Sequence, residues 1–290
     1  MQRRIIAAAA AALTLTLALP ALPAQAAKPT PPADNYVAVG DSVAAGFGAP
    51  KAYPELVDTK AKKLHLQGNH AVVGAKVADI ATQLGNVPAA SRDAVTRLTL
   101  TVGANDIGWA ETLQFCLEPG APVTCAPALA AAQAKLDLLP GQLAALLIDI
   151  KDDTSTTAPP FVDPLVFRNA KLYVSGYYEL FGSKPRACTL STTDNAVFSI
   201  SKENKAAYNQ LTRKLNTAIK DAVKLANAAL PGTPVKYVNV ASVMNGHGLC
   251  DSARRWVVGP QDVSSASLGY VSHPNAKGQA AIAQRYYANG

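Results

Sequence analysis

The chain has 290 residues, of which 49% are hydrophobic and 16% are charged, and its formal net charge is +7. The apolar fraction excludes a disordered chain, and the absence of a glycine period excludes a collagen. The positive charge is spread along the chain without a basic run, which argues against nucleic acid as the main partner.

The N-terminal segment has the pattern of a secretory signal peptide. Arg3 and Arg4 precede an apolar run from Ile5 to Leu19, and the small-residue triplet Ala24-Gln25-Ala26 follows. The apolar run is shorter than the ~20 residues that a membrane-spanning helix needs. We therefore expect residues 1–26 to be removed and the mature chain to be secreted, without a stable membrane span.

The mature chain is predicted to be one domain. A proline-rich leader occupies residues 27–35, and the domain covers residues 36–290. The stretch from 152 to 164 is rich in Asp, Thr, Ser and Pro, which is the composition of a long surface loop. We expect a monomer.

Short apolar segments alternate with long helical ones along this domain. Helices are predicted at 127–150, with a break at Pro140 and Gly141, and at 202–230, where apolar residues recur at spacings of three and four. Strands rich in Val, Leu and Tyr are predicted at 36–39, 71–73, 98–102, 171–174 and 235–240. This alternation predicts an α/β fold, a three-layer sandwich with a mostly parallel five-stranded sheet and helices on both faces.

The four cysteines are interpreted as two disulfides, because an exported chain enters an oxidising compartment. Three pairings are possible. The short segment between Cys116 and Cys125 favours a bond between those two, which leaves Cys188 to pair with Cys250. A zinc site at His247 and Cys250 lacks a second Cys/His pair to complete four ligands, so no metal is expected.

Three residues lie where the predicted sheet would place a site, and a histidine near the C-terminus is a fourth candidate. Ser42, Gly74 and Asn105 each follow a predicted strand, and ligands bind such sheets at the carboxyl ends of the strands. His273 precedes a proline, which holds it in extended backbone. Taken singly, these residues have plainer roles as a helix cap, turn residues and a surface histidine. The motifs of lipase-type nucleophile elbows, zinc proteases and nucleotide sites are absent.

In their order and spacing, four blocks resemble the SGNH hydrolases, also called GDSL esterases and lipases. The blocks are Gly40-Asp41-Ser42, Gly74, Gly103-Ala104-Asn105-Asp106 and His273-Pro274-Asn275. The cysteines after the third block and the stretch from Gly246 to Cys250 are similar to those of secreted actinobacterial members. The resemblance implies the flavodoxin-like fold of that family and a carboxylic ester hydrolase that uses no metal or organic cofactor.

The roles that the resemblance implies follow the same blocks. Ser42 would be the nucleophile and His273 its general base. The backbone N–H groups of Ser42 and Gly74 and the side chain of Asn105 would form the oxyanion hole, where negative charge develops during acyl transfer.

One position departs from the family pattern. Most members carry an acid three residues before the histidine, where this chain has Tyr270, and a phenol is not ionised at neutral pH. The main-chain carbonyl of Tyr270 is the expected partner of the His273 imidazole, which would give a Ser42/His273 dyad. The alternative is an acid from elsewhere, with Asp251 and Asp262 nearest in sequence.

The expected function is that of a secreted serine hydrolase that cleaves lipid or simple acyl esters through an acyl-enzyme intermediate. A small-molecule or lipid ester is thus the expected partner. The runner-up is a carbohydrate acetylesterase, because the same catalytic groups can remove acetyl from sugars. The alternative of another class is a catalytically inactive secreted binding protein on the same scaffold, which the missing acid would explain.

Overall fold

A computed structural model describes residues 34–60, 64–117, 121–152, 166–182, 186–230, 232, 234–251 and 254–288. The predicted signal peptide, most of the leader and nearly all of the predicted surface loop lie outside these residues. Within the described ranges, no helix is long and apolar enough to cross a membrane.

A parallel sheet of five strands forms the middle layer, in the order β2-β1-β3-β4-β7. The strands are β1 (Asp34–Gly40), β2 (Leu64–Asn69), β3 (Val95–Thr101), β4 (Lys171–Ser175) and β7 (Lys236–Val238). This confirms the predicted α/β fold with a parallel five-stranded sheet. The strand order changes direction between β1 and β3, which is the point where sheets of this kind bind ligands.

The central strands form where the sequence is continuously apolar. Residues 36–39 of β1 are fully buried, as expected for a strand covered on both faces. β1 begins at Asp34, inside the predicted leader, because Asp34 and Asn35 pair with Leu64 and His65 of β2.

The predicted strand at 71–73 is wrong. The second strand is instead β2, which lies at the sheet edge and alternates between half-buried and exposed residues. An edge strand has fewer covered residues and so needs no continuous apolar run. Val72 and Val73 are 55% and 50% exposed in the loop that follows.

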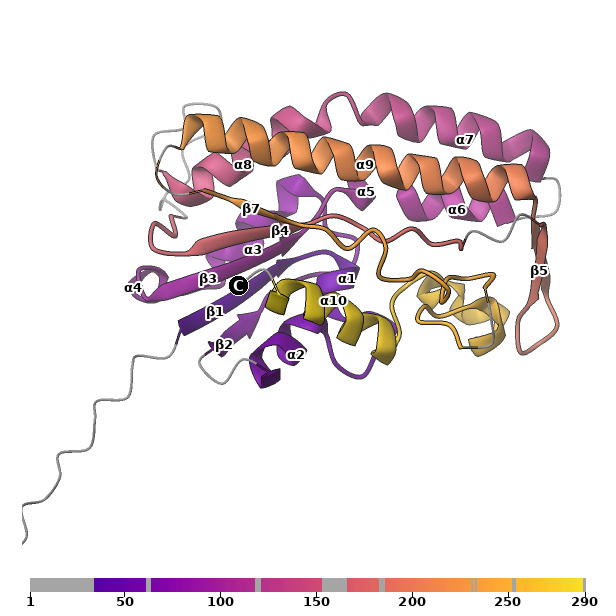
Figure 1. Cartoon of the computed structure of the whole chain (residues 1–290), viewed down its shortest axis with the longest axis horizontal. Coiled ribbons are helices and arrows are strands. Elements are labelled where there is room, and N and C mark those ends of the chain that lie inside the picture. The colour runs from indigo at the N-terminus through magenta and orange to yellow at the C-terminus, as the bar shows by residue number, and fades with distance from the viewer. Residues whose placement is uncertain are drawn as a thin grey trace, which may run out of the picture. The chain divides into compact units, whose positions relative to one another are not determined.

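Helices cover both faces of the sheet, as predicted. Figure 1 shows α7, α8 and α9 over one face and α2 with α10 over the other. The longer helices are α2 (Tyr53–Lys60), α6 (Trp109–Leu117), α7 (Ala121–Lys135), α8 (Leu139–Lys151), α9 (Lys202–Ala229) and α10 (Ala276–Ala288). The short ones are α1 (Ser42–Ala45), α3 (Ile80–Gly85), α4 (Ala89–Arg92) and α5 (Ala104–Ile107).

Both helix predictions are confirmed in outline. α9 matches the predicted segment 202–230, and the segment 127–150 contains two helices, α7 and α8. Pro140 lies in the first turn of α8, where its missing N–H has no partner to lose.

A two-stranded antiparallel hairpin, β5 (Cys188–Ser191) and β6 (Val197–Ile200), stands apart from the main sheet and was not predicted. The two disulfides are Cys116–Cys125 and Cys188–Cys250, the pairing that the spacing favoured. The first joins α6 to α7, and the second joins the hairpin to the loop after β7.

Candidate active site

Ser42 lies at the carboxyl end of β1, at a sharp turn into α1. Gly40 makes this turn at a φ of 141°, and a Cβ there would overlap the Thr101 carbonyl of β3, so the position requires glycine. The side-chain amide of Gln83 holds Gly40 at both ends: Gly40 N–H donates to Oε1 at 2.7 Å, and Nε2 donates to Gly40 O at 2.9 Å. The backbone leading to Ser42 is therefore tightly fixed.

Asp41 caps the short helix that begins at Ser42. Its Oδ1 accepts the N–H of Val43 at 3.0 Å. The carboxyl group is almost completely buried, and burial raises its pKa to about 7.

His273 reaches Ser42 from the loop before α10. Its Nε2 lies 2.8 Å from Ser42 Oγ, and its Nδ1 lies 3.3 Å from the carbonyl oxygen of Tyr270. With the proton on Nδ1 donated to that carbonyl, Nε2 is free to accept the hydroxyl proton of Ser42. Burial lowers the pKa of His273, so the imidazole is neutral at neutral pH, the form that a general base requires.

The loop that carries His273 is locked from two sides. Ser272 adopts a φ of 75°, and its carbonyl accepts the Tyr178 hydroxyl at 2.6 Å. Val258 pairs with both residues: Ser272 N–H donates to Val258 O at 2.9 Å, and Val258 N–H donates to His273 O at 2.8 Å. A positive φ outside glycine costs energy and persists only where neighbouring contacts hold it, as they do here.

The two acids that were considered as partners of the imidazole are engaged elsewhere. Both oxygens of Asp262 accept from Arg255 Nη2, at 2.9 and 3.1 Å. Asp251 caps a turn by accepting the N–H of Gly248 at 2.9 Å. The hydrogen-bond partner of Nδ1 is the Tyr270 carbonyl.

Gly74 lies on the loop after β2, and Asn105 lies in α5, the short helix that follows β3; β2 and β3 are the strands on either side of β1. Asn105 Nδ2 donates to Ala75 O at 2.9 Å, and the Asp106 carboxylate accepts the N–H of Val77 at 3.1 and 3.2 Å. These bonds join the segment after β2 to the segment after β3. Because the carboxyl ends of neighbouring parallel strands meet at one edge, the segments that carry Gly74, Ser42 and Asn105 share that edge.

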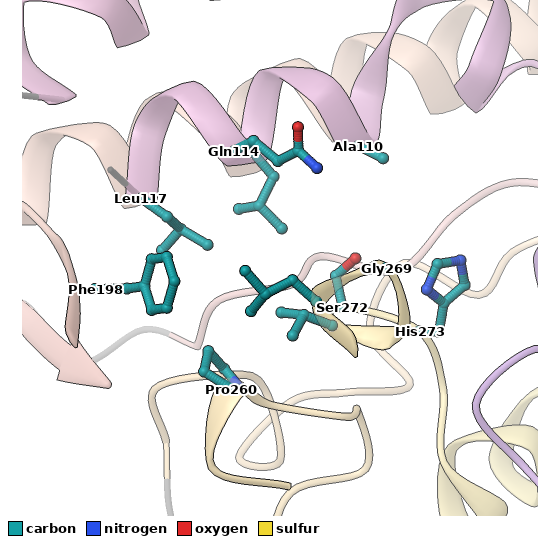
Figure 2. Close-up of a pocket in the computed structure, with 11 residues that line it drawn as sticks. Ala110, Gln114, Leu117, Phe198, Pro260, Gly269, Ser272 and His273 are labelled. Atoms are coloured by element: carbon teal, nitrogen blue, oxygen red, sulfur yellow. The ribbon is translucent and has the colours of Figure 1, made fainter. Parts of the chain in front are cut away.

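An apolar cavity of about 270 Å³ begins at His273. Figure 2 shows the imidazole at one end of the lining residues, with Leu117 and Phe198 at the other. The walls come from α6, β6 and the segment before His273; the lining residues are Ala110, Leu113, Gln114, Leu117, Phe198, Pro260, Leu268, Gly269, Val271, Ser272 and His273. Their side chains offer a pocket for an apolar group joined to a carbonyl at Ser42.

Sequence reasoning missed this pocket because its walls come from distant segments. One local signal was available for the hairpin: Asp194 and Asn195 are turn residues between two short runs of β-forming residues. For a metal, the described residues contain no group of three His, Cys, Asp or Glu side chains placed to hold an ion.

Comparison with known proteins finds a matching family model and similar relatives. Residues 38–281 match the family model described as GDSL-like Lipase/Acylhydrolase family. The chain is 31% identical over 289 residues to Lipase 1 of Streptomyces coelicolor, covering 95% of this chain and 91% of that protein. It is 30% identical over 299 residues to a lipase of Streptomyces rimosus, covering 96% and 95%.

Two solved structures share the fold. Phospholipase A1 from Streptomyces albidoflavus NA297 has a TM-score of 0.65 and 21% identity, covering 89% of this chain and 100% of that chain. The extracellular lipase from Streptomyces rimosus has a TM-score of 0.61 and 22% identity, covering 87% and 99%.

Proposed function

The chain belongs to the GDSL-like lipase/acylhydrolase family and is a carboxylic ester hydrolase, and on that premise we propose that it is a secreted serine enzyme for esters with an extended acyl chain. One observation carries the proposal: Ser42 Oγ and His273 Nε2 lie 2.8 Å apart, with an apolar cavity beginning at the imidazole.

The proposed reaction begins with proton transfer from Ser42 Oγ to His273 Nε2 as Oγ attacks the ester carbonyl carbon. The Tyr270 carbonyl holds the imidazolium through Nδ1–H. The oxyanion accepts hydrogen bonds from the N–H groups of Ser42 and Gly74 and from Asn105 Nδ2.

The tetrahedral intermediate then collapses. The bond to the leaving oxygen breaks, and His273 gives its proton to that oxygen, so an alcohol departs and Ser42 keeps the acyl group. Water then hydrolyses the acyl-enzyme. His273 takes a proton from a water molecule as the water oxygen attacks the acyl carbon. The bond from that carbon to Ser42 Oγ then breaks, Oγ takes the proton back from His273, and the carboxylic acid leaves.

The pocket supports an acyl chain as its occupant. Most of its lining side chains are apolar, and among the described residues no charged side chain lines it. Burial of each CH₂ group contributes about 0.8 kcal/mol. An acetyl group would leave most of the cavity unfilled, so the geometry favours a lipid ester over a sugar acetate.

Secretion has three separate supports. The first 26 residues carry the signal-peptide pattern, although they lie outside the described part of the chain. The described chain contains two disulfides, which persist in oxidising compartments. The Streptomyces rimosus relative in the structural comparison is described as an extracellular lipase.

The serine mechanism predicts covalent labelling at one position. A biotinylated fluorophosphonate should label the wild-type protein and leave Ser42→Ala unlabelled, because only an activated hydroxyl attacks phosphorus at a useful rate. Mass spectrometry of the labelled peptide locates the adduct, and circular dichroism shows that Ser42→Ala is folded. Labelling of the alanine variant, or an unreactive wild type that still cleaves esters, would contradict the mechanism.

The pocket predicts a dependence on acyl-chain length. Across aryl esters from acetyl to palmitoyl, kcat/KM should rise by roughly fourfold for each CH₂ that the cavity covers and then level off. Phe198→Ala removes a side chain at the far end of the cavity and should move the plateau to longer chains. Val197→Ala is the matched control. Val197 precedes Phe198 on the same strand, and its side chain is 55% exposed on the opposite face. A preference for acetyl would favour a sugar acetylesterase instead.

A further inference from the structure

Tyr177 is a buried residue just beyond β4 whose phenol contacts two turns of the site. Its hydroxyl donates a short hydrogen bond to Oδ2 of Asp41, and the same oxygen accepts the N–H of Ala104 at 3.2 Å. Asp41 immediately precedes Ser42, and Ala104 immediately precedes Asn105. The hydroxyl oxygen of Tyr177 therefore links the turn that carries Ser42 to the turn that carries Asn105.

The phenol is itself held from outside the site. Asn216 on α9 pairs with the backbone of Tyr177 in both directions: Tyr177 N–H donates to Asn216 Oδ1 at 2.6 Å, and Asn216 Nδ2 donates to Tyr177 O at 2.7 Å. The preceding residue is Gly176, where a Cβ would overlap Asn216 Oδ1. Tyr177 is thus anchored to the longest helix of the fold and is not a freely rotating side chain.

The protonated phenol sets the direction of its hydrogen bond to Asp41. Burial raises the pKa of Tyr177 well above its ordinary value, so the phenol keeps its proton and donates it to Asp41. Asp41 in turn uses its other oxygen to cap α1 at Val43. Each polar atom of the Asp41 side chain and of the phenol has a partner, as a buried polar network requires.

We propose that Tyr177 is a positioning residue for ester hydrolysis, which holds the Ser42 turn and the Asn105 turn at a fixed separation. The inference rests on the proposed function, because it needs Ser42 as nucleophile and Asn105 as oxyanion donor. Both groups must meet one carbonyl, Ser42 at its carbon and Asn105 at its oxygen. Without the phenol oxygen, the Asp41 carboxylate and the Ala104 N–H lose their shared partner, and the two turns are free to shift relative to one another.

The test removes that one oxygen atom. Tyr177→Phe should lower kcat on an aryl ester by about 10- to 100-fold, because a displacement of about 1 Å between reacting groups can slow a reaction by up to about 100-fold. KM should stay within about twofold of wild type. Tyr173→Phe is the matched control: Tyr173 is also fully buried, and its hydroxyl has no hydrogen-bond partner among the described residues. It should leave kcat and KM unchanged. Thermal melts establish that both variants are folded.

A double-mutant cycle separates positioning from a general loss of structure. The Asn105→Ala variant has no side-chain amide at position 105 to be positioned, so adding Tyr177→Phe to it should lower kcat by less than about threefold. The proposal would be overturned if Tyr177→Phe lowered kcat by the same factor in the Asn105→Ala background as in the wild type. It would also be overturned if the Tyr177→Phe enzyme had the same kcat and KM as Tyr173→Phe. Failure of fluorophosphonate labelling at Ser42 would overturn the proposed function itself, so the two failures are distinguishable.

Discussion

His273→Ala is expected to lower kcat for an aryl ester by about 10⁴- to 10⁶-fold, because the variant lacks the general base that we propose for Ser42. The imidazole lies 2.8 Å from Ser42 Oγ, and burial lowers its pKa, so it is available as a base in the wild-type enzyme at neutral pH. KM should change little, since the lost interaction belongs to the transition state. Steady-state kinetics with highly purified variant protein gives both values.

The Ser42/His273 dyad also predicts how kcat changes when the two nearby acids are replaced. Asp262→Asn and Asp251→Asn should keep kcat within about threefold of wild type, because Nδ1 donates to the Tyr270 carbonyl and both carboxylates have other partners. Each variant is assayed below its own melting temperature, since Asp251 is buried and caps a turn. A loss in either variant that approaches the loss in His273→Ala would make that acid the third catalytic member and contradict the dyad.

The central part of the fold could be predicted because its signals are local. β1 is a continuous apolar run, and α9 shows an apolar stripe along its length, so burial follows from composition and period alone. β2 has no such signal: its residues, Leu64–Asn69, include His65, Gln67 and Asn69, and the strand exists because the edge of β1 is there to pair with it. The apolar residues after β2 are exposed in a loop instead.

The candidate site also contains parts that could be predicted from local sequence signals and parts that could not. Ser42, Gly74 and Asn105 could be placed at one edge because each follows a strand, even though the strand before Gly74 was predicted at the wrong residues. The absence of an acid at Tyr270 directed attention to the main-chain carbonyl, which lies 3.3 Å from Nδ1. The cavity walls and the contacts of Tyr177 could not be predicted, because they depend on how segments far apart in sequence pack.

Asn105→Ala is expected to lower kcat by about 100- to 1,000-fold, because it removes one of the hydrogen-bond donors that we propose for the oxyanion. Asn105 Nδ2 also donates to Ala75 O, so the same change loosens the loop that carries Gly74. Asp106→Ala is the matched control for that second effect. The Asp106 carboxylate accepts the N–H of Val77 in the same loop, and alanine has no side-chain acceptor for that bond.

The two contributions of Asn105 separate in the kinetics. Loss of an oxyanion donor should slow both ester turnover and phosphonylation of Ser42, since the phosphoryl oxygen occupies the same hole, while KM stays near wild type. Loosening of the loop alone should appear in Asp106→Ala as a decrease in kcat of less than about tenfold. If Asn105→Ala raises KM while kcat and the phosphonylation rate are preserved, the amide binds the ground state, and the oxyanion hole must consist of backbone N–H groups alone.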